Sequence, residues 1–330
     1  MGLHISNIYL TMMMLVVMSY VINRFSNLLG NALHKLEAKL HIPKSVRGAT
    51  FDAISSSLPE LVTALIAILV YKKFDDIGIP TVAGSGIFNI LLIPMFVLLF
   101  YKGKQKIMQI DHKVLKRDIF FYIGALIIFF SFVAYGQLNV WTGVVLLAWY
   151  IFYALVLYKQ TQNFQNNHDE TKTEIKDSYL KIALISLSSL LVIWFAIDSI
   201  IFSAITISHT LHIPEYIIAL IILAACTSIP DTLLSIKSAR KGDMEGSLAN
   251  AIGSNIFDVT VCLGLPLIIY FKPIEINLGE NLYLFVFLIL SMLVTALVLL
   301  QKKGFQKRDA FFMGLAYLVF LGYVVYKIIC

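Results

Sequence analysis

The chain has 330 residues, of which 59% are hydrophobic and 14% charged, and its mean hydropathy is +0.82. This composition leaves too few polar side chains to cover a soluble domain, so it excludes a soluble globular protein and indicates a membrane protein. The net charge of +6 does not indicate a nucleic-acid partner, because the basic residues lie in short connections beside apolar segments.

About ten apolar segments follow one another along the chain, each long enough to cross a hydrocarbon core of about 30 Å as a helix. They are residues 6–25, 46–71, 78–101, 118–135, 139–158, 179–206, 214–236, 247–271, 281–300 and 309–328. Their apolar runs are continuous rather than alternating, which favours helices over a barrel. The first segment lacks the features of a cleaved signal peptide, so we expect it to be retained. Cys226 and Cys262 fall inside predicted helices without disulfide or zinc spacing and are expected to be packing residues.

Basic residues predict the orientation of these segments. Of the 26 Lys and Arg residues, 22 lie in or beside the connections that follow the odd-numbered segments. The other connections and the C-terminal segment hold only Lys72, Lys73, Lys272 and Lys327. Because basic residues are enriched in cytoplasmic loops, we predict a plasma (inner) membrane protein with both termini outside.

Two stretches of the chain repeat at the same spacing. The string LHIP occurs at residues 40–43 and 211–214, and Pro59 and Pro230 are also 171 residues apart. Further on, GSGIFN at residues 84–89 matches GSNIFD at residues 253–258. The shared spacing indicates an internal duplication.

The hydrophilic connection at residues 159–177 separates the two copies. We therefore predict a five-helix repeat at residues 1–158, a cytoplasmic linker at 159–177 and a second five-helix repeat at 178–330. Five crossings is an odd number, so the second repeat enters the membrane in the opposite sense. Inverted repeats are typical of secondary transporters, whose binding site lies near the midplane where the halves meet.

Each copy carries a carboxylate directly after its proline. These are Glu60 and Asp231. A carboxylate near the bilayer centre costs at least about 2.5 kcal/mol, so two at equivalent positions need a partner. No Lys or Arg lies within these helices, and a bound cation is the simplest compensation. Carboxylates, hydroxyls and the carbonyls freed by a helix break form the oxygen shell that Ca²⁺ and Na⁺ prefer.

The second motif of each copy adds polar residues four apart on one helical face. These are Ser85 with Asn89, and Ser254 with Asp258. We expect Asn89 and Asp258 to be ligands, whereas Gly84 and Gly253 are expected to allow close helix packing.

Two further acids, Asp52 and Asp198, have no acidic counterpart in the other copy. Asp52 is compatible with a proton site, a lining residue of a cytoplasmic vestibule or a structural residue. For Asp198 we favour a structural role.

The sequences SSSLPEL and TSIPDTLLS, each followed by a GS-x-IF segment, resemble the two inverted repeats of the cation/Ca²⁺ antiporter superfamily. Within it, the chain looks most like the potassium-dependent branch of the sodium/calcium exchanger family and its prokaryotic relatives. The resemblance implies an all-α polytopic sodium/calcium exchanger fold of about ten helices, without enzymatic activity or cofactor. It also implies a metal site built from both repeats. Its ligands would be the main-chain carbonyls of Ala53 and Ala224 and the side chains of Ser56, Ser57, Glu60, Ser85, Asn89, Thr227, Ser228, Asp231, Ser254 and Asp258.

The chain departs from the family pattern at several positions. Ser55 and Cys226 stand where glycine is usual, Gly86 replaces a common Asn, and Asp52 replaces an apolar residue. An acid at Asp258 is associated with a K⁺ requirement, but relatives that do not need K⁺ also have one. The residue therefore permits K⁺ without establishing it.

The resulting hypothesis is a secondary active antiporter that exchanges Na⁺ for Ca²⁺ by alternating access, with K⁺ co-transport left open. The expected partners are the bilayer and inorganic cations, with no obligate protein partner. One alternative is a Ca²⁺/H⁺ antiporter of the same fold, which Asp52 keeps open. More remote alternatives are a passive channel and an intramembrane aspartyl protease with Glu60 and Asp231 as its dyad.

Overall fold

The computed structural model describes residues 8–39, 53–102, 112–165, 177–276, 278–301 and 306–329. The first half contains α1 (Ile8–Lys39), α3 (Ala53–Ser56), α4 (Leu58–Ile66), the π-helical segments η2 (Ala67–Tyr71) and η3 (Phe74–Gly78), α5 (Ile79–Phe100), α6 (His112–Ala134) and α7 (Val140–Gln165). The second half contains α8 (Tyr179–Leu211), α9 (Glu215–Ile218), η4 (Ala219–Leu223), α10 (Ala224–Thr227), α11 (Ile229–Arg240), α12 (Met244–Phe257), η5 (Asp258–Cys262), α13 (Leu263–Tyr270), α14 (Leu278–Leu299) and α15 (Asp309–Ile329). Two short strands, β1 (Gln137–Leu138) and β2 (Ile274–Glu275), pair antiparallel.

The described part of the chain confirms an all-helical membrane protein. Eight of its helices are long and apolar enough to cross a membrane, and a ninth span results if Glu215–Thr227 and Ile229–Arg240, bent by 42°, are counted together. The second predicted segment contributes a shorter apolar helix, Leu58–Tyr71. Several of the described helices extend beyond their predicted ends; among them, α1 runs to Lys39, α7 to Gln165 and α8 to Leu211. Hydropathy marks only the apolar part of a helix, so polar helical turns beyond the hydrocarbon core escape it.

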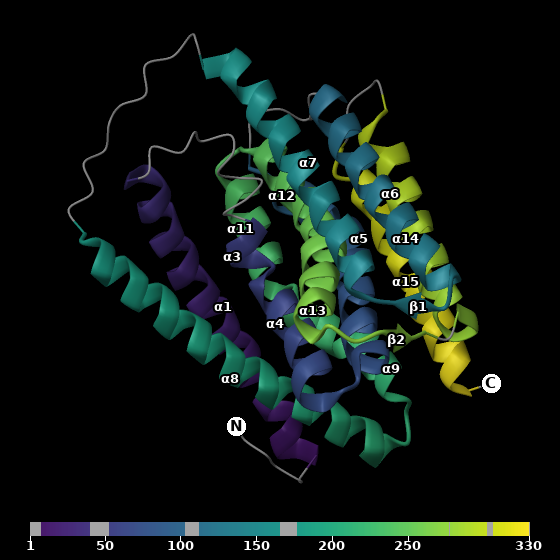
Figure 1. Ribbon diagram of the computed structural model, residues 1–330. Helices are drawn as coiled ribbons and strands as arrows, with labels where there is room; N and C mark the ends of the chain where they lie inside the picture. Colours follow the sequence, from purple (N-terminus) through teal and green to yellow (C-terminus); the bar gives the residue numbers. More distant parts are fainter. Residues whose placement is uncertain are drawn as a thin grey trace.

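Two long helices lie apart from the rest of the bundle. Figure 1 shows α1 and α8 packed side by side along one flank, while α6, α14 and α15 lie on the opposite side. Between them, α5 contacts α11, α12, α14 and α15 and forms the centre of the bundle. The first turn of α1 and the last turn of α15 lie at the same end.

The two halves are interrupted at equivalent positions. The chain leaves α3 after Ser56 and α10 after Thr227, and the next helices begin at Leu58 and Ile229, each with a proline in its first turn. All of these positions keep the 171-residue spacing that the sequence predicts. The proline ring disfavours a continuous helix, since it has no N–H and clashes with the preceding turn. The breaks place the carboxylates that follow the prolines at the start of α4 and α11.

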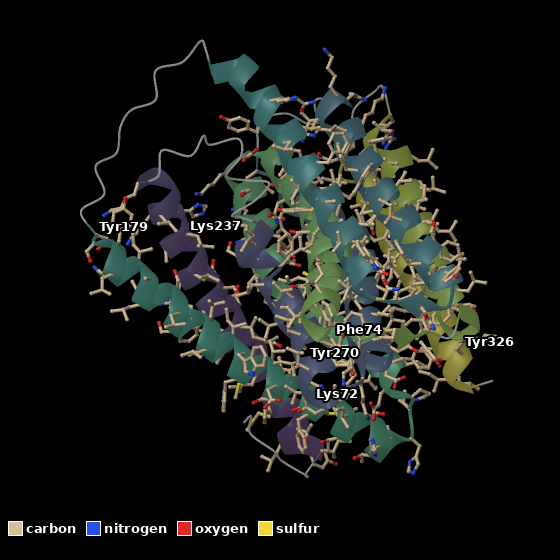
Figure 2. The ribbon with its side chains drawn as sticks, in the orientation of Figure 1. Lys72, Phe74, Tyr179, Lys237, Tyr270 and Tyr326 are labelled. Atoms are coloured by element: carbon tan, nitrogen blue, oxygen red, sulfur yellow. The ribbon has the colours of Figure 1, made fainter. Side chains whose placement is uncertain are left out.

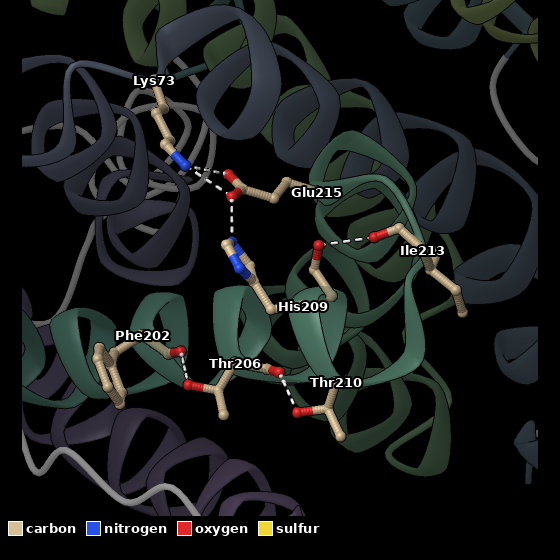
Figure 3. Close-up of polar contacts among 8 residues, drawn as sticks. Lys73, Phe202, Thr206, His209, Thr210, Ile213 and Glu215 are labelled. Carbon is tan, nitrogen blue, oxygen red and sulfur yellow. Dashed lines mark hydrogen bonds and ion pairs between the residues drawn. The ribbon is translucent and has the colours of Figure 1, made fainter.

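Polar contacts join the elements at the end of the bundle where the first turn of α1 lies. Lys73, in the turn between η2 and η3, forms an ion pair with both carboxylate oxygens of Glu215 at 2.6 and 2.7 Å. His209, near the end of α8, lies 3.1 Å from the same carboxylate (Figure 3). These contacts connect α8 and α9 to the first half of the chain.

The second LHIP string lies at this same junction. Leu211 ends α8, His212 adopts a left-handed conformation with φ 56°, and Pro214 is the residue immediately before α9. Pro214 therefore occupies the capping position of α9, and the helix itself begins at Glu215. The first string, at residues 40–43, lies outside the described residues.

Candidate cation-binding site

The site lies where the two broken helices meet α5 and α12. Glu60 is in the first turn of α4, and Asp231 is in the first turn of α11. Asp258 opens the π-helical segment η5, and all three carboxylates are fully buried at 0% exposure. The hydrophobic interior cannot solvate three charges, so the surrounding polar atoms decide what the site can hold.

Glu60 accepts a hydrogen bond from a serine of its own half, and that serine also contacts a serine of the second half. Ser85 Oγ donates to Glu60 Oε1 at 3.0 Å and lies 2.6 Å from Ser228 Oγ. Thr227 lies near Glu60, and its hydroxyl donates to Ala224 O at 3.2 Å. Each repeat therefore contributes hydroxyl groups to the surroundings of Glu60.

Asp231 is surrounded by hydroxyl and amide groups from both halves. Ser254 Oγ donates to its Oδ1 at 2.8 Å, and Ser57 Oγ lies 3.4 Å from its Oδ2. Asn89 Nδ2 lies 3.5 Å from the same Oδ2, and Ser56 is within hydrogen-bonding range. The two longest of these contacts are weak hydrogen bonds, so Oδ2 is incompletely satisfied.

Three oxygens at the site are buried without any hydrogen-bond partner. They are Glu60 Oε2, Asn89 Oδ1 and Asp258 Oδ2. None of the ion pairs found among the described residues involves Glu60, Asp231 or Asp258. Buried acceptors of this kind are costly unless a donor or cation satisfies them. Carboxylate, amide and hydroxyl oxygens are the ligands that a hard cation prefers. Among the described residues, no three His, Cys, Asp or Glu side chains are grouped so that they could hold a metal by themselves, so a cation here would also need the amide and hydroxyl oxygens.

The structure brings together the ten side chains that the resemblance implies. Each lies at the helix breaks, on α5, or at the junction of α12 with η5. The two main-chain positions differ from them: Ala53 opens α3, and the carbonyl of Ala224 already accepts the backbone N–H of Ser228 at 3.0 Å.

Sequence reasoning missed two residues beside the third acid. Cys262, expected to be a packing residue, has its Sγ 3.6 Å from Asp258 Oδ1 and 3.7 Å from Ser57 O. Asn255 Nδ2 donates to the main-chain oxygen of Gly86 at 2.9 Å, which links α12 to α5. Their spacing from Asp258, four residues after and three before, was a signal that they share its helical face.

The remaining sequence predictions have different outcomes. A Cβ at Gly84 would overlap the main-chain oxygen of Leu220, so the close packing expected there is confirmed, whereas the nearest atom to a Cβ at Gly253 lies 4.0 Å away. Asp198 accepts a hydrogen bond from Tyr71 Oη at 3.0 Å, in keeping with a structural role. Asp52 lies outside the described residues.

A small polar cavity of about 110 Å³ adjoins the site. Its lining includes Ser26, Asn27 and Asn31 of α1, Ser56 of α3, and Lys237 of α11. Ser56 lines this cavity and also belongs to the surroundings of Asp231. Figure 2 shows Lys72 nearer the end of the bundle away from Lys237, and Lys237 is one of the residues that line the cavity.

Comparison with known families gives a match over most of the chain. The family described as "Sodium/calcium exchanger protein" matches residues 10–159 and 181–326. The inner membrane protein YrbG of Escherichia coli (strain K12) is 28% identical over 243 residues, which is 72% of each chain. The human sodium/potassium/calcium exchanger 2 is 36% identical over 147 residues, covering 42% of this chain and 21% of that protein. The chain thus matches about a fifth of the length of such exchangers.

Two kinds of solved structure share the fold. The H⁺/Ca²⁺ exchanger CAX superposes with a TM-score of 0.74 at 16% identity, covering 96% of this chain and 84% of the other. The sodium-calcium exchanger NCX_Mj superposes with a TM-score of 0.65 at 21% identity, covering 96% and 99%. At these identities the likeness concerns the fold alone, and it does not distinguish Na⁺ from H⁺.

Proposed function

The chain belongs to the sodium/calcium exchanger protein family, and we propose that it exchanges Na⁺ for Ca²⁺ across the membrane by alternating access. It is a multi-pass membrane cation exchanger and not an enzyme, so the aspartyl protease alternative is set aside. The identity of the coupled ions and the direction of Ca²⁺ export from the cytoplasm are parts of the proposal.

The observation that carries the proposal is the set of unpartnered oxygens on Glu60, Asn89 and Asp258 at the centre of the bundle. Ca²⁺ takes six to eight oxygen ligands and tolerates irregular geometry. Together with Asp231 and the hydroxyls of Ser57 and Ser254, these groups provide enough oxygens for such a shell. Na⁺ uses the same kind of ligand, so the two cations would compete for one site.

The charge of the site supports coupled exchange rather than a leak. Three ionised carboxylates without a cation are unfavourable in a low-dielectric interior, so a site that lacks cations resists reorientation. One Ca²⁺ neutralises two of the three formal charges, whereas several Na⁺, or Ca²⁺ with K⁺, neutralise all of them. After the site has released one kind of ion on one side of the membrane, it can return to the other side only with another kind of ion bound.

The arrangement of the helices supports alternating access. The α1 and α8 pair lies beside the bundle that carries the ligands, and among the twelve implied ligands none comes from either helix. The polar cavity reaches Ser56 between α1 and α11, on the side that carries Lys237. We propose that this side faces the cytoplasm, with both termini outside, and that sliding of α1 and α8 opens and closes the route.

The test is Ca²⁺ uptake into proteoliposomes that are loaded with Na⁺ and diluted into Na⁺-free buffer, with and without K⁺. A parallel experiment replaces the Na⁺ gradient by a pH gradient of matched size. We expect the Na⁺ gradient to drive uptake. The variants Glu60→Gln and Asp231→Asn should abolish it, while Glu275→Gln, an exposed acid on β2, should not. Uptake driven only by the pH gradient would show that the chain is instead a Ca²⁺/H⁺ exchanger.

A further inference from the structure

Besides Asn89 and Asp258, the second motifs of the two repeats differ at one more position. The motif GSGIFN has Gly86 where its copy GSNIFD has Asn255. Asn255 Nδ2 donates to Gly86 O at 2.9 Å, and a symmetric molecule would have a second, reciprocal amide at position 86. This chain has only the first amide, so the crossing of α5 and α12 is asymmetric.

The side chain that residue 86 lacks is replaced by residues of two other helices. A Cβ on Gly86 would lie 2.9 Å from Leu288 Cδ2, 3.4 Å from Tyr122 Oη and 3.9 Å from Asn255 Nδ2. Tyr122 comes from α6 and Leu288 from α14, and both are buried. The phenol hydroxyl therefore reaches the place from which an amide at position 86 would project.

Tyr122 and Asn255 have complementary unused atoms. Tyr122 Oη and Asn255 Oδ1 are both buried without a hydrogen-bond partner, and both residues have 0% exposure. Tyr122 lies beside Asn255 and within electrostatic range of Asp258. A hydroxyl donates one proton and an amide oxygen accepts, so the two unused groups have the chemistry to pair while Asn255 Nδ2 keeps its bond to Gly86 O.

The position of Asn255 makes this contact important for the site. Its neighbour Ser254 donates to Asp231 at 2.8 Å, and the neighbour of Gly86, Ser85, donates to Glu60 at 3.0 Å. The bond from Asn255 to Gly86 thus fixes the separation of the two serines that hold the central carboxylates. Selection among divalent cations depends on cavity size and ligand rigidity.

We propose that Tyr122 is a positioning residue that sets the size selectivity of the site: its hydroxyl donates to Asn255 Oδ1 and locks the amide that ties α12 to α5. The proposal rests on the proposed function, because it assumes that the carboxylates bind a divalent cation.

The first test is binding of radioactive Ca²⁺ to the purified full chain, with Sr²⁺ and Mg²⁺ as competitors. We expect Tyr122→Phe to reduce the preference for Ca²⁺ over Sr²⁺ about fivefold, the size of effect that one hydrogen bond produces. The matched control is Tyr283→Phe, which removes the hydroxyl of a buried tyrosine that packs against Tyr323 and Lys327 on α15. An unchanged preference in Tyr122→Phe, or an equal change in the control, would overturn the proposal.

Rescue provides a second test. The double variant Tyr122→Phe/Gly86→Asn removes the phenol hydroxyl and supplies an amide from position 86 instead. The end of the flexible Leu288 side chain can move aside to make room for the new asparagine. We expect this double variant to recover Ca²⁺ preference relative to Tyr122→Phe alone, whereas Gly86→Asn in the parent chain lowers it. A double variant that binds like Tyr122→Phe, although folded, would count against the proposed role.

A third measurement separates this proposal from the proposed function. Thermal unfolding of Tyr122→Phe, Asn255→Ala and the combined variant should show clear coupling between the two side chains. If the parent chain binds neither Ca²⁺ nor Sr²⁺, the proposed function fails. The coupling in thermal unfolding then still tests whether Tyr122 and Asn255 interact. Additive effects of the two substitutions would refute this interaction.

Discussion

The hydroxyl oxygens of Ser85 and Ser228 lie 2.6 Å apart and join the central helix of one repeat to the helix break of the other. Ser85 also donates to Glu60 at 3.0 Å. A hydroxyl has a single proton, so when Ser85 donates to the carboxylate, Ser228 must donate to Ser85. This short chain makes Glu60 dependent on both halves of the molecule.

Replacement of Ser85 by Ala should therefore weaken cation binding. The change removes one hydrogen bond to a charged group, worth about 1.5–3 kcal/mol, and leaves Ser228 Oγ without its partner. We expect the half-saturating Ca²⁺ concentration to rise by roughly ten- to a hundredfold. The measurement is radioactive Ca²⁺ binding, with Ser188→Ala on α8 as control, since Ser188 Oγ is exposed and bonds only its own helix at Ile185 O. Equal binding by the Ser85 and Ser188 variants would contradict the expectation.

The two glycines that open the repeated motifs should differ in their tolerance of a methyl group. In Gly84→Ala the new Cβ overlaps Leu220 O, a backbone atom that cannot turn aside, and lies 2.7 Å from Ala224 Cβ. We expect a loss of stability of about 1–3 kcal/mol, as for other overpacked sites. In Gly253→Ala the nearest atom is 4.0 Å away, and the effect should be small. Thermal unfolding of both variants in detergent checks this, and equal melting temperatures would show the packing argument to be wrong.

The Lys35 and Lys181 ammonium groups link α1 and α8 through Asp177 at 2.6 Å each. Hydrogen bonds from Lys181 and Lys35 lower the pKa of Asp177 from 3.8 to about 2. A lowered pKa means that the ionised form is favoured by folding, so the contribution is fully present above the ordinary value and is lost as pH falls toward 2. We expect Asp177→Asn to melt slightly below the parent chain at pH 6, with a difference that shrinks as the pH falls from 4 to 2.5. A difference that grows with acidity would contradict this, and the effect should be small because the pair is partly exposed.

The charge of Lys237 at the polar cavity should oppose the approach of divalent cations. Replacement by Gln removes one positive charge from the lining while leaving Ser56 and the carboxylates in place. At low ionic strength we expect the half-saturating Ca²⁺ concentration on the proposed cytoplasmic side to fall about two- to threefold, and the change to disappear in high salt. The control is Lys241→Gln, at the end of α11 and exposed. Transport in vesicles of known orientation checks the prediction, and an effect from the opposite side would show that the cavity is not the route.

The sequence predicted the centre of the site better than its periphery. Glu60 and Asp231 could be placed because a proline and a carboxylate recur at one spacing, and this pattern is local. Tyr122 could not, since its place beside Asn255 depends on how α6 packs against α12. The spacing of Cys262 from Asp258 was a local signal, but its approach to Ser57 O depends on how η5 packs against the helix break of the first repeat.

The ends of the helices escaped prediction for a different reason. Apolar residues report the part of a helix inside the hydrocarbon, whereas the last turns of α1 and α7 are polar and remain helical through backbone hydrogen bonding. Hydropathy therefore supported the all-helical architecture but placed helix ends inside the actual ones.

The helix breaks at Ser57 and Ser228 have an electrical consequence. At each break one helix ends in carbonyl groups and the next begins with amide groups, so a cation meets the negative end of one dipole while the carboxylate beside it meets the positive end of the other. Because α4 and α11 run in opposite directions (Figure 1), their dipoles cancel along the bundle axis. The backbone at the breaks therefore adds little net field along the bundle axis, and the local field at the site comes from the carboxylates and the helix ends beside them.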